Sequence, residues 1–105
     1  MKFYPGKILL SHKGEEMEEV VPKGGLQKIT LGVVTVEALL RELPQDQNAP
    51  GKTKVQRWSL AQLVQKNISQ KEMILSAEDI ALIKSRIEQA FPATIVGPSS
   101  VAIEG

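Results

Sequence analysis

The chain offers few side chains that could carry out a reaction. Its single histidine, His12, stands beside the Lys13-Gly14 turn, and no serine lies in the G-x-S-x-G elbow that would make it a nucleophile. The absence of cysteine excludes disulfides, thiolate metal sites and cysteine nucleophiles. We therefore expect His12 to be an exposed turn residue and the protein not to be an enzyme.

A group of carboxylates follows this turn and could attract a divalent cation. Hard cations need oxygens that converge from a shaped loop, such as D-x-D-x-D-G with a distal glutamate. Successive residues of a strand point to opposite faces, so this group indicates a solvated strand and not a metal site. The glycines match neither phosphate-binding pattern, so no cofactor is expected either. The carboxylates are those of Glu15, Glu16, Glu18 and Glu19.

Basic residues between positions 52 and 71 raise the alternative of a small DNA-binding regulator. The stretch "SLAQLVQKNISQKEM" is similar to the first helix and turn of a helix-turn-helix, with Asn67 as the turn residue. However, the next helix starts afresh at Ser76, and Glu78 and Asp79 would repel phosphate where a reading helix makes its contacts. The candidate nucleic-acid contacts are Lys52, Lys54, Arg57, Lys66 and Lys71.

The elements that must position these residues begin with a β-hairpin. Residues 7–11 and 16–21 are typical of two strands joined at Lys13-Gly14, and Pro22, Gly24 and Gly25 are expected to end the hairpin.

A first helix is predicted over residues 31–43. Thr30 can cap its start, Pro44 stops it, and residues 44–51 form a loop. Apolar residues at helical spacing predict its inward face, which comprises Val33, Val36, Leu40 and Leu43, with Leu39 beside them.

A second helix is predicted over residues 52–67. Its apolar residues spread over a wide arc, which indicates burial on more than one flank. Trp58 is expected to pack between this helix and the hairpin, with an interface anchor or a base-stacking platform as alternatives. The arc consists of Trp58, Leu60, Ala61, Val64 and Ile68.

A third helix is predicted over residues 77–91, with Ser76 as its N-cap and Pro92 closing its end. Leu82 points away from the inward face of this helix, toward water. The inward face comprises Ile80, Ile83, Ile87, Ala90 and Phe91.

Residues 92–105 form an apolar tail. Gly97-Pro98 is expected to prevent one continuous helix, although Ser99 or Ser100 could start a short final turn. Val96, Val101 and Ile103 are too apolar for a solvated end, so they dock either on this chain's own core or on a neighbour.

The 105 residues are thus expected to form one α+β domain that is mainly α, with a hairpin (1–25), a helical core (26–91) and the tail (92–105). The apolar content of 42% and the charged content of 24% are ordinary, and a net charge of +1 gives no global attraction to nucleic acid. Apolar runs are too short to cross a bilayer, and residues 1–16 do not read as a signal peptide. We expect the protein to act in the cytoplasm of the cell that makes it.

Two stretches, "GKTKVQRWSLAQLVQKN" and "LSAEDIALIKSRIEQAFPATIVG", resemble a family of small proteins of tailed bacteriophages and prophages. The shared pattern has a Lys-x-x-Arg/Lys-x-x-Leu-Ala helix, then a capped "L-[ST]-A-E-[DE]-I-A-L-I-K" helix, then an apolar "[IV]-V-G". The matching residues are Lys54, Arg57, Leu60-Ala61, Leu75 to Lys84 and Ile95-Val96-Gly97, with a "TLG" helix start at Thr30-Leu31-Gly32. Pro98-Ser99-Ser100 departs from the Leu/Glu-rich end that is usual in the family.

The resemblance implies a protein without a catalytic motif that acts as a virion component, an assembly factor or a host-interaction module, in the host cytoplasm or in the virion. We predict a non-enzymatic phage or prophage protein that acts through protein contacts, with itself as a homo-oligomer or with other phage proteins. The candidate contact residues are Trp58, Leu82, Val96, Val101 and Ile103.

Overall fold

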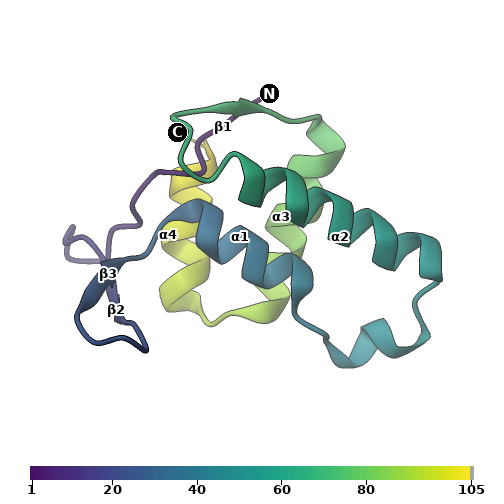
Figure 1. Cartoon of the computed structure of the whole chain (residues 1–105), viewed down its shortest axis with the longest axis horizontal. Coiled ribbons are helices and arrows are strands. Elements are labelled where there is room, and N and C mark those ends of the chain that lie inside the picture. The colour runs from purple at the N-terminus through teal and green to yellow at the C-terminus, as the bar shows by residue number, and fades with distance from the viewer. Residues whose placement is uncertain (105) are drawn as a thin grey trace.

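The computed structural model describes residues 1–104, and it is an α+β fold in which α1 (Leu31–Leu40) lies at the centre. This helix packs against α2 (Gly51–Lys66), α3 (Ala77–Ala90) and α4 (Ala93–Glu104) (Figure 1). A 3-10 helix, η1 (Pro44–Asn48), connects α1 to α2. The α+β class and the predominance of helix are therefore confirmed.

Two small antiparallel sheets complete the fold. Strand β1 (Lys2–Phe3) pairs with β4 (Met73–Ile74), which ties the first residues to the segment that precedes α3. Strand β2 (Glu18–Val20) pairs with β3 (Leu26–Lys28) in a hairpin that projects from the helices (Figure 1). Strands of two or three residues are too short to show an alternating pattern, and for this reason β1, β3 and β4 were not predicted.

The predicted hairpin is correct only in part. Residues 7–11 and 16–17 do meet, through a bridge between Leu10 and Glu16 and a hydrogen bond of 2.9 Å from the Met17 amide to the Leu9 carbonyl. The regular pairing lies further along the chain, because Gly24 and Gly25 adopt φ of +85° and +89° and reverse the chain into β3. These glycines therefore form the hairpin's turn, and do not mark its end.

The caps of α1 and α3 are as predicted. The Val33 amide donates to the Thr30 hydroxyl at 3.3 Å, and the Asp79 amide donates to the Ser76 hydroxyl at 3.0 Å. Each cap satisfies one of the amides that a helix start leaves without a partner.

The predicted inward face of the first helix is wrong by about one residue position. Leu40 is 46% exposed and Val33 and Val36 are only half-buried. The helix also ends at Leu40, because Arg41 and Leu43 take extended conformations before Pro44. The residues of α1 that are buried are Leu31, Gly32, Val34, Thr35, Ala38 and Leu39.

The last segment is a helix and not an apolar tail, although Pro98 lies inside it. A proline in a helix removes one backbone hydrogen bond, yet here the helix continues, with Ser99 and Ala102 buried against the rest of the fold. Packing thus outweighs the local cost of the proline. The core comprises Phe3, Leu9, Leu31, Val34, Ala38, Leu39, Leu60, Ala61, Val64, Met73, Leu75, Ile80, Ile83, Ile87 and Ala102.

Gly32 generates the first testable prediction. A Cβ at this position would lie 2.7 Å from the Pro5 carbonyl oxygen and would also collide with the Ile68 side chain. We expect Gly32→Ala to lower the free energy of unfolding by about 1–3 kcal/mol, because the backbone of Pro5 cannot move away without disturbing the core. Chemical denaturation measures the change.

The matched control is Gly51→Ala at the start of α2, where an added Cβ meets nothing within 4 Å and the next residue is not a proline. This change is expected to stabilise the helix by about 0.5–1 kcal/mol, since alanine loses less conformational entropy than glycine. Equal effects of the two substitutions would contradict the close contact at Gly32.

Candidate functional site: a buried ion network and three surface hollows

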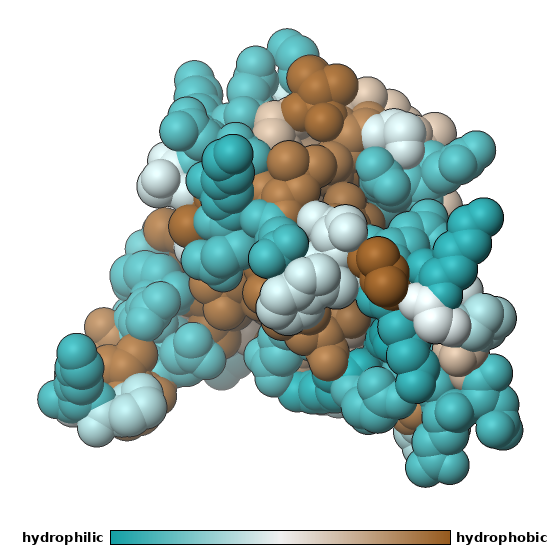
Figure 2. All heavy atoms as spheres, turned by 45° about the vertical axis from the view of Figure 1, so that its right-hand side comes forward, coloured by the Kyte–Doolittle hydropathy of each residue, from teal (hydrophilic) through white to brown (hydrophobic). Residues whose placement is uncertain are grey.

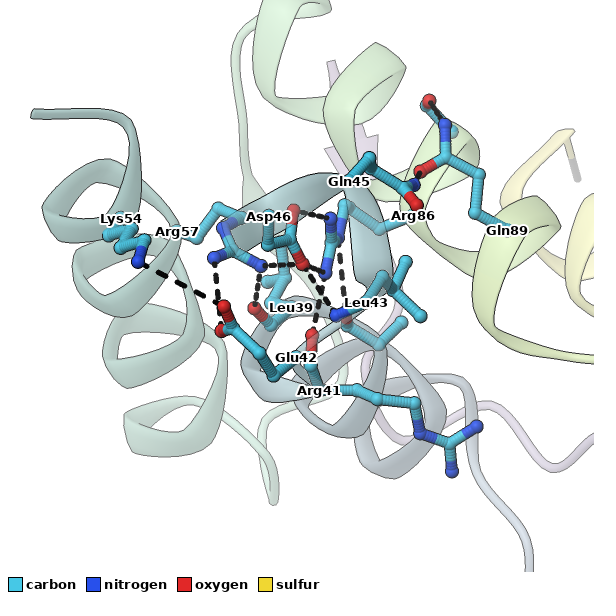
Figure 3. A network of polar contacts seen from close by, with 12 residues as sticks. Leu39, Arg41, Glu42, Leu43, Gln45, Asp46, Lys54, Arg57, Arg86 and Gln89 are labelled. Atoms are coloured by element: carbon cyan, nitrogen blue, oxygen red, sulfur yellow. Dashed lines mark hydrogen bonds and ion pairs between the residues drawn. The ribbon is translucent and has the colours of Figure 1, made fainter. Parts of the chain in front are cut away.

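Four charged side chains meet where α1, η1, α2 and α3 converge, and Asp46 is at their centre (Figure 3). Arg86 of α3 donates to both carboxylate oxygens, at 2.8 Å to Oδ1 and 2.9 Å to Oδ2. Arg57 of α2 donates to Oδ2 at 3.1 Å, and the Leu43 amide donates to the same oxygen at 2.8 Å. The fourth side chain, Glu42, lies at 3.9 Å from Arg57.

The two arginines also satisfy the carboxyl end of α1. Arg86 donates to the Ala38 and Arg41 carbonyls at 3.3 and 2.7 Å, and Arg57 donates to the Leu39 carbonyl at 3.4 Å. Helix ends leave carbonyls without intrahelical partners, so these bonds cap α1 from two neighbouring helices. The network therefore fixes the positions of α1, α2 and α3 relative to one another.

The Arg86 guanidinium beside Asp46 is the main cause that lowers the pKa of this carboxyl from 3.8 to about 2. Burial acts in the opposite direction, and the Leu43 amide and Arg57 add to the lowering. The carboxylate is thus held in its charged form by partners already in place. Asp46, Arg57 and Arg86 are all buried, so the network is an internal support of the fold and does not present a site to a ligand.

This network corrects the expectation for Arg57 as a nucleic-acid contact. Only 7% of its side chain is exposed, and its guanidinium is engaged with Asp46 and Leu39. Lys52, Lys54, Lys66 and Lys71 are all exposed, and Lys54 lies 3.9 Å from Glu42. The five basic residues therefore do not form one free surface.

His12 is exposed, as expected, and it borders a hollow whose lining within residues 1–104 includes no carboxylate. Among residues 1–104, no three His, Asp or Glu side chains come close enough together to hold a metal ion. No helix in the described chain combines the length and the apolar character needed to span a membrane.

The first surface hollow is the α1–α2 groove, a depression of about 620 Å³. Its apolar rim includes Leu40, 46% exposed, and Trp58, 53% exposed. Trp58 therefore does not pack in the core against the hairpin, which corrects that expectation. Figure 2 shows the molecule with the right-hand side of Figure 1 turned forward. In this view apolar surface runs through the middle of the molecule, with hydrophilic residues on both sides of it. The groove is lined by Val36, Leu40, Trp58, Ala61, Gln62, Gln65 and Lys66.

The second hollow, of about 850 Å³, is the α4 groove between residues 7–17 and α4. Val101 is 71% exposed there and Leu10 is 50% exposed. The third hollow is the basic cavity, of about 920 Å³, between residues 1–7, the loop 69–71, α3 and the end of α4. Ile103 belongs to its lining.

The five predicted contact residues are therefore distributed over separate places. Trp58, Val101 and Ile103 each belong to a different hollow. Leu82 and Val96 are half-buried and pack against the core.

The network that holds the fold generates a second prediction. Asp46→Ala is expected to lower the free energy of unfolding by about 3–5 kcal/mol, because two buried guanidinium groups lose their counter-charge. Thermal or urea unfolding measures the loss. Gln47→Ala, at an exposed position of the same 3-10 helix, should change stability by no more than about 0.5 kcal/mol. A loss as small as the control's would show that the network does not support the fold.

The lowered pKa of Asp46 predicts a specific pH dependence. The carboxyl titrates near 3.8 in the unfolded chain and near 2 in the fold, so its contribution is complete above about pH 4 and is lost as the pH falls toward 2. The stability advantage of the wild type over Asp46→Asn should therefore shrink across that window. Urea unfolding of both proteins from pH 6 to pH 2, at about equal ionic strength, measures it. An advantage that is constant with pH would contradict the lowered pKa.

Comparison of the chain with known proteins found no matching family model, no matching curated protein and no matching solved structure.

Proposed function

We propose that this chain is a non-enzymatic phage or prophage protein that acts through protein–protein contacts in virion structure or assembly. The sequence resemblance to small phage proteins supports the biological setting. The exposed tryptophan of the α1–α2 groove supports the mode of action.

Trp58 is the observation that carries the proposal. Its side chain on α2 is about half exposed and lines the groove together with Leu40 and Val36. The other lining residues are Ala61, two glutamines and one lysine. Tryptophan is among the residues that contribute most to binding energy at protein interfaces, where it fills a pocket away from water. A single exposed apolar residue is normal on a protein surface. Trp58, however, is exposed next to other apolar side chains, and a contiguous apolar patch is characteristic of a contact surface.

The geometry also gives the groove a fixed shape. Arg57, the residue before Trp58, is held by Asp46 at 3.1 Å and by the carboxyl end of α1. Because the same network joins α1 and α2, the two walls of the groove are set before a partner arrives, which reduces the ordering cost of binding. Duplex DNA is not proposed as the partner, because the burial of Arg57 divides the basic residues of α2.

The test uses the proteins encoded by neighbouring genes, purified after co-expression with this chain. Trp58→Lys is expected to weaken binding of the cognate neighbour by at least about tenfold, with a stability change within about 0.5 kcal/mol because the side chain is half exposed. Calorimetric titration measures the affinity. Gln56→Ala, an exposed position of α2 that does not line the groove, is the control and should bind as the wild type does.

Two outcomes would overturn the proposal. One is that Trp58→Lys binds the neighbour with unchanged affinity. The other is salt-sensitive binding of duplex DNA that Lys52→Ala and Lys54→Ala weaken, with no protein partner among the neighbours.

A further inference from the structure

The β2–β3 hairpin is joined to the rest of the fold at its base, where the Met17 amide donates to the Leu9 carbonyl and the Leu9 amide donates to the Ile29 carbonyl, and its two strands project beyond this contact (Figure 1). All six residues of its strands are exposed. Val20 and Leu26 are paired across the strands, and they are 78% and 68% exposed. An isolated two-stranded hairpin is marginally stable in water. Burial of this apolar pair against another surface would lower the free energy of the hairpin.

The segment that enters this hairpin, residues 15–21, is strongly acidic and contains no basic residue. Lys28 neutralises part of it, at 2.8 Å from Glu18 and 3.3 Å from Glu16, and these carboxylates raise the pKa of Lys28. Glu15 and Glu19 have no ion pair within residues 1–104. The hairpin thus combines apolar side chains with carboxylates that lack a counter-charge.

The basic cavity has the opposite charge. Within residues 1–104, four lysines line it, from β1, the following turn, the loop before β4 and α3, against a single carboxylate, that of Glu104. The whole chain has a formal net charge of only +1, so positive charge is concentrated here and the remainder is net negative. A concave basic site of this kind attracts acidic groups. The lysines are Lys2, Lys7, Lys71 and Lys84.

Two of these lysines are free to bind an acidic group. Lys84 lies 3.3 Å from Glu104 and Lys2 lies 3.9 Å from Glu72. Lys7 and Lys71 have no ion pair within residues 1–104. The lining also includes apolar side chains, among them Ile80, which is buried, and Ile103, which is half-buried. The cavity therefore suits an acidic segment that also carries apolar side chains.

One molecule cannot bring the two features together. No residue between 8 and 28 lines the basic cavity, and the hairpin projects away from the part of the fold where the N and C labels lie (Figure 1). We propose that the β2–β3 hairpin of one copy docks into the basic cavity of a second copy, with the face that carries Val20 and Leu26 against the apolar lining residues and with the unpaired Glu15 and Glu19 attracted by the positive charge of Lys7 and Lys71. This inference rests on the proposed function and deepens it by naming one partner.

The proposed contact is heterologous, because it joins different surfaces of identical chains. Each added copy leaves one free hairpin and one free cavity, so the assembly either grows as a filament or closes into a ring. A ring or filament of this kind suits the structural role in a particle that is proposed above.

The test reverses charges on each surface separately. One variant carries Glu15→Lys with Glu19→Lys, and the other carries Lys7→Glu with Lys71→Glu; all four positions are without ion pairs in the described chain, so both variants should fold. In each variant the hairpin and cavity have the same sign of charge, and we expect the dissociation constant for self-association to rise by about tenfold or more. Mixing the two variants restores opposite charges across the contact, and assembly should return. Sedimentation velocity over a range of concentrations measures self-association of each variant and of the mixture.

The controls are Lys52→Glu and Glu88→Lys, exposed positions outside both surfaces, which should assemble as the wild type does. Raising NaCl from about 50 to 500 mM should weaken wild-type assembly, because the rim charges are screened. A wild type that stays monomeric at about 1 mM, or a mixture that fails to recover assembly, would overturn the inference. Trp58→Lys should leave self-association intact, so its result bears on the proposed function alone.

Discussion

The fold depends on one carboxylate that two arginines share. Asp46 lies in a 3-10 turn, yet it receives Arg57 from α2 and Arg86 from α3, while the same arginines bond to carbonyls at the end of α1. Charges removed from water are costly unless they are paired and hydrogen-bonded, and here nearly every donor is directed at an acceptor. Because the three helices share this network, their relative positions are set by directional bonds as well as by apolar packing.

This arrangement leaves the surface free for contact. The charges that support the fold are buried, and the charges on the surface are unevenly distributed, with lysines around one hollow and glutamates along the hairpin. Apolar residues are exposed on the α1–α2 groove and on the hairpin, where they cost the free chain little in stability. The proposed contacts use these surfaces without any change to the core.

The sequence predicted the features that depend on local chemistry. Ser76 and Thr30 cap their helices, and Ile80, Ile83 and Ile87 face the core, because capping and helical periodicity act over a few residues. The predicted inward face of α1 was wrong because the helix carries apolar side chains of its own on nearly all sides, and periodicity then does not single out one face. Asp46 was read as part of a polar loop, since nothing in "PQDQN" indicates the two arginines that reach it. The position of Arg86 beside Ile83 and Ile87 was the available signal: a charged residue on a buried stripe requires a partner.

The pairing of β1 with β4 has a consequence for how the protein is made. Residues 2–3 leave the ribosome well before their partners at 73–74, because about seventy residues separate the two strands. Until then Phe3, which ends in the core, has no strand beside it and no finished helical layer to enter. Contacts between such distant residues close late, because the entropy of the intervening loop must be overcome first. We therefore expect this part of the fold to stay incomplete until β4 has been synthesised, and residues 2–3 to reach their native positions late.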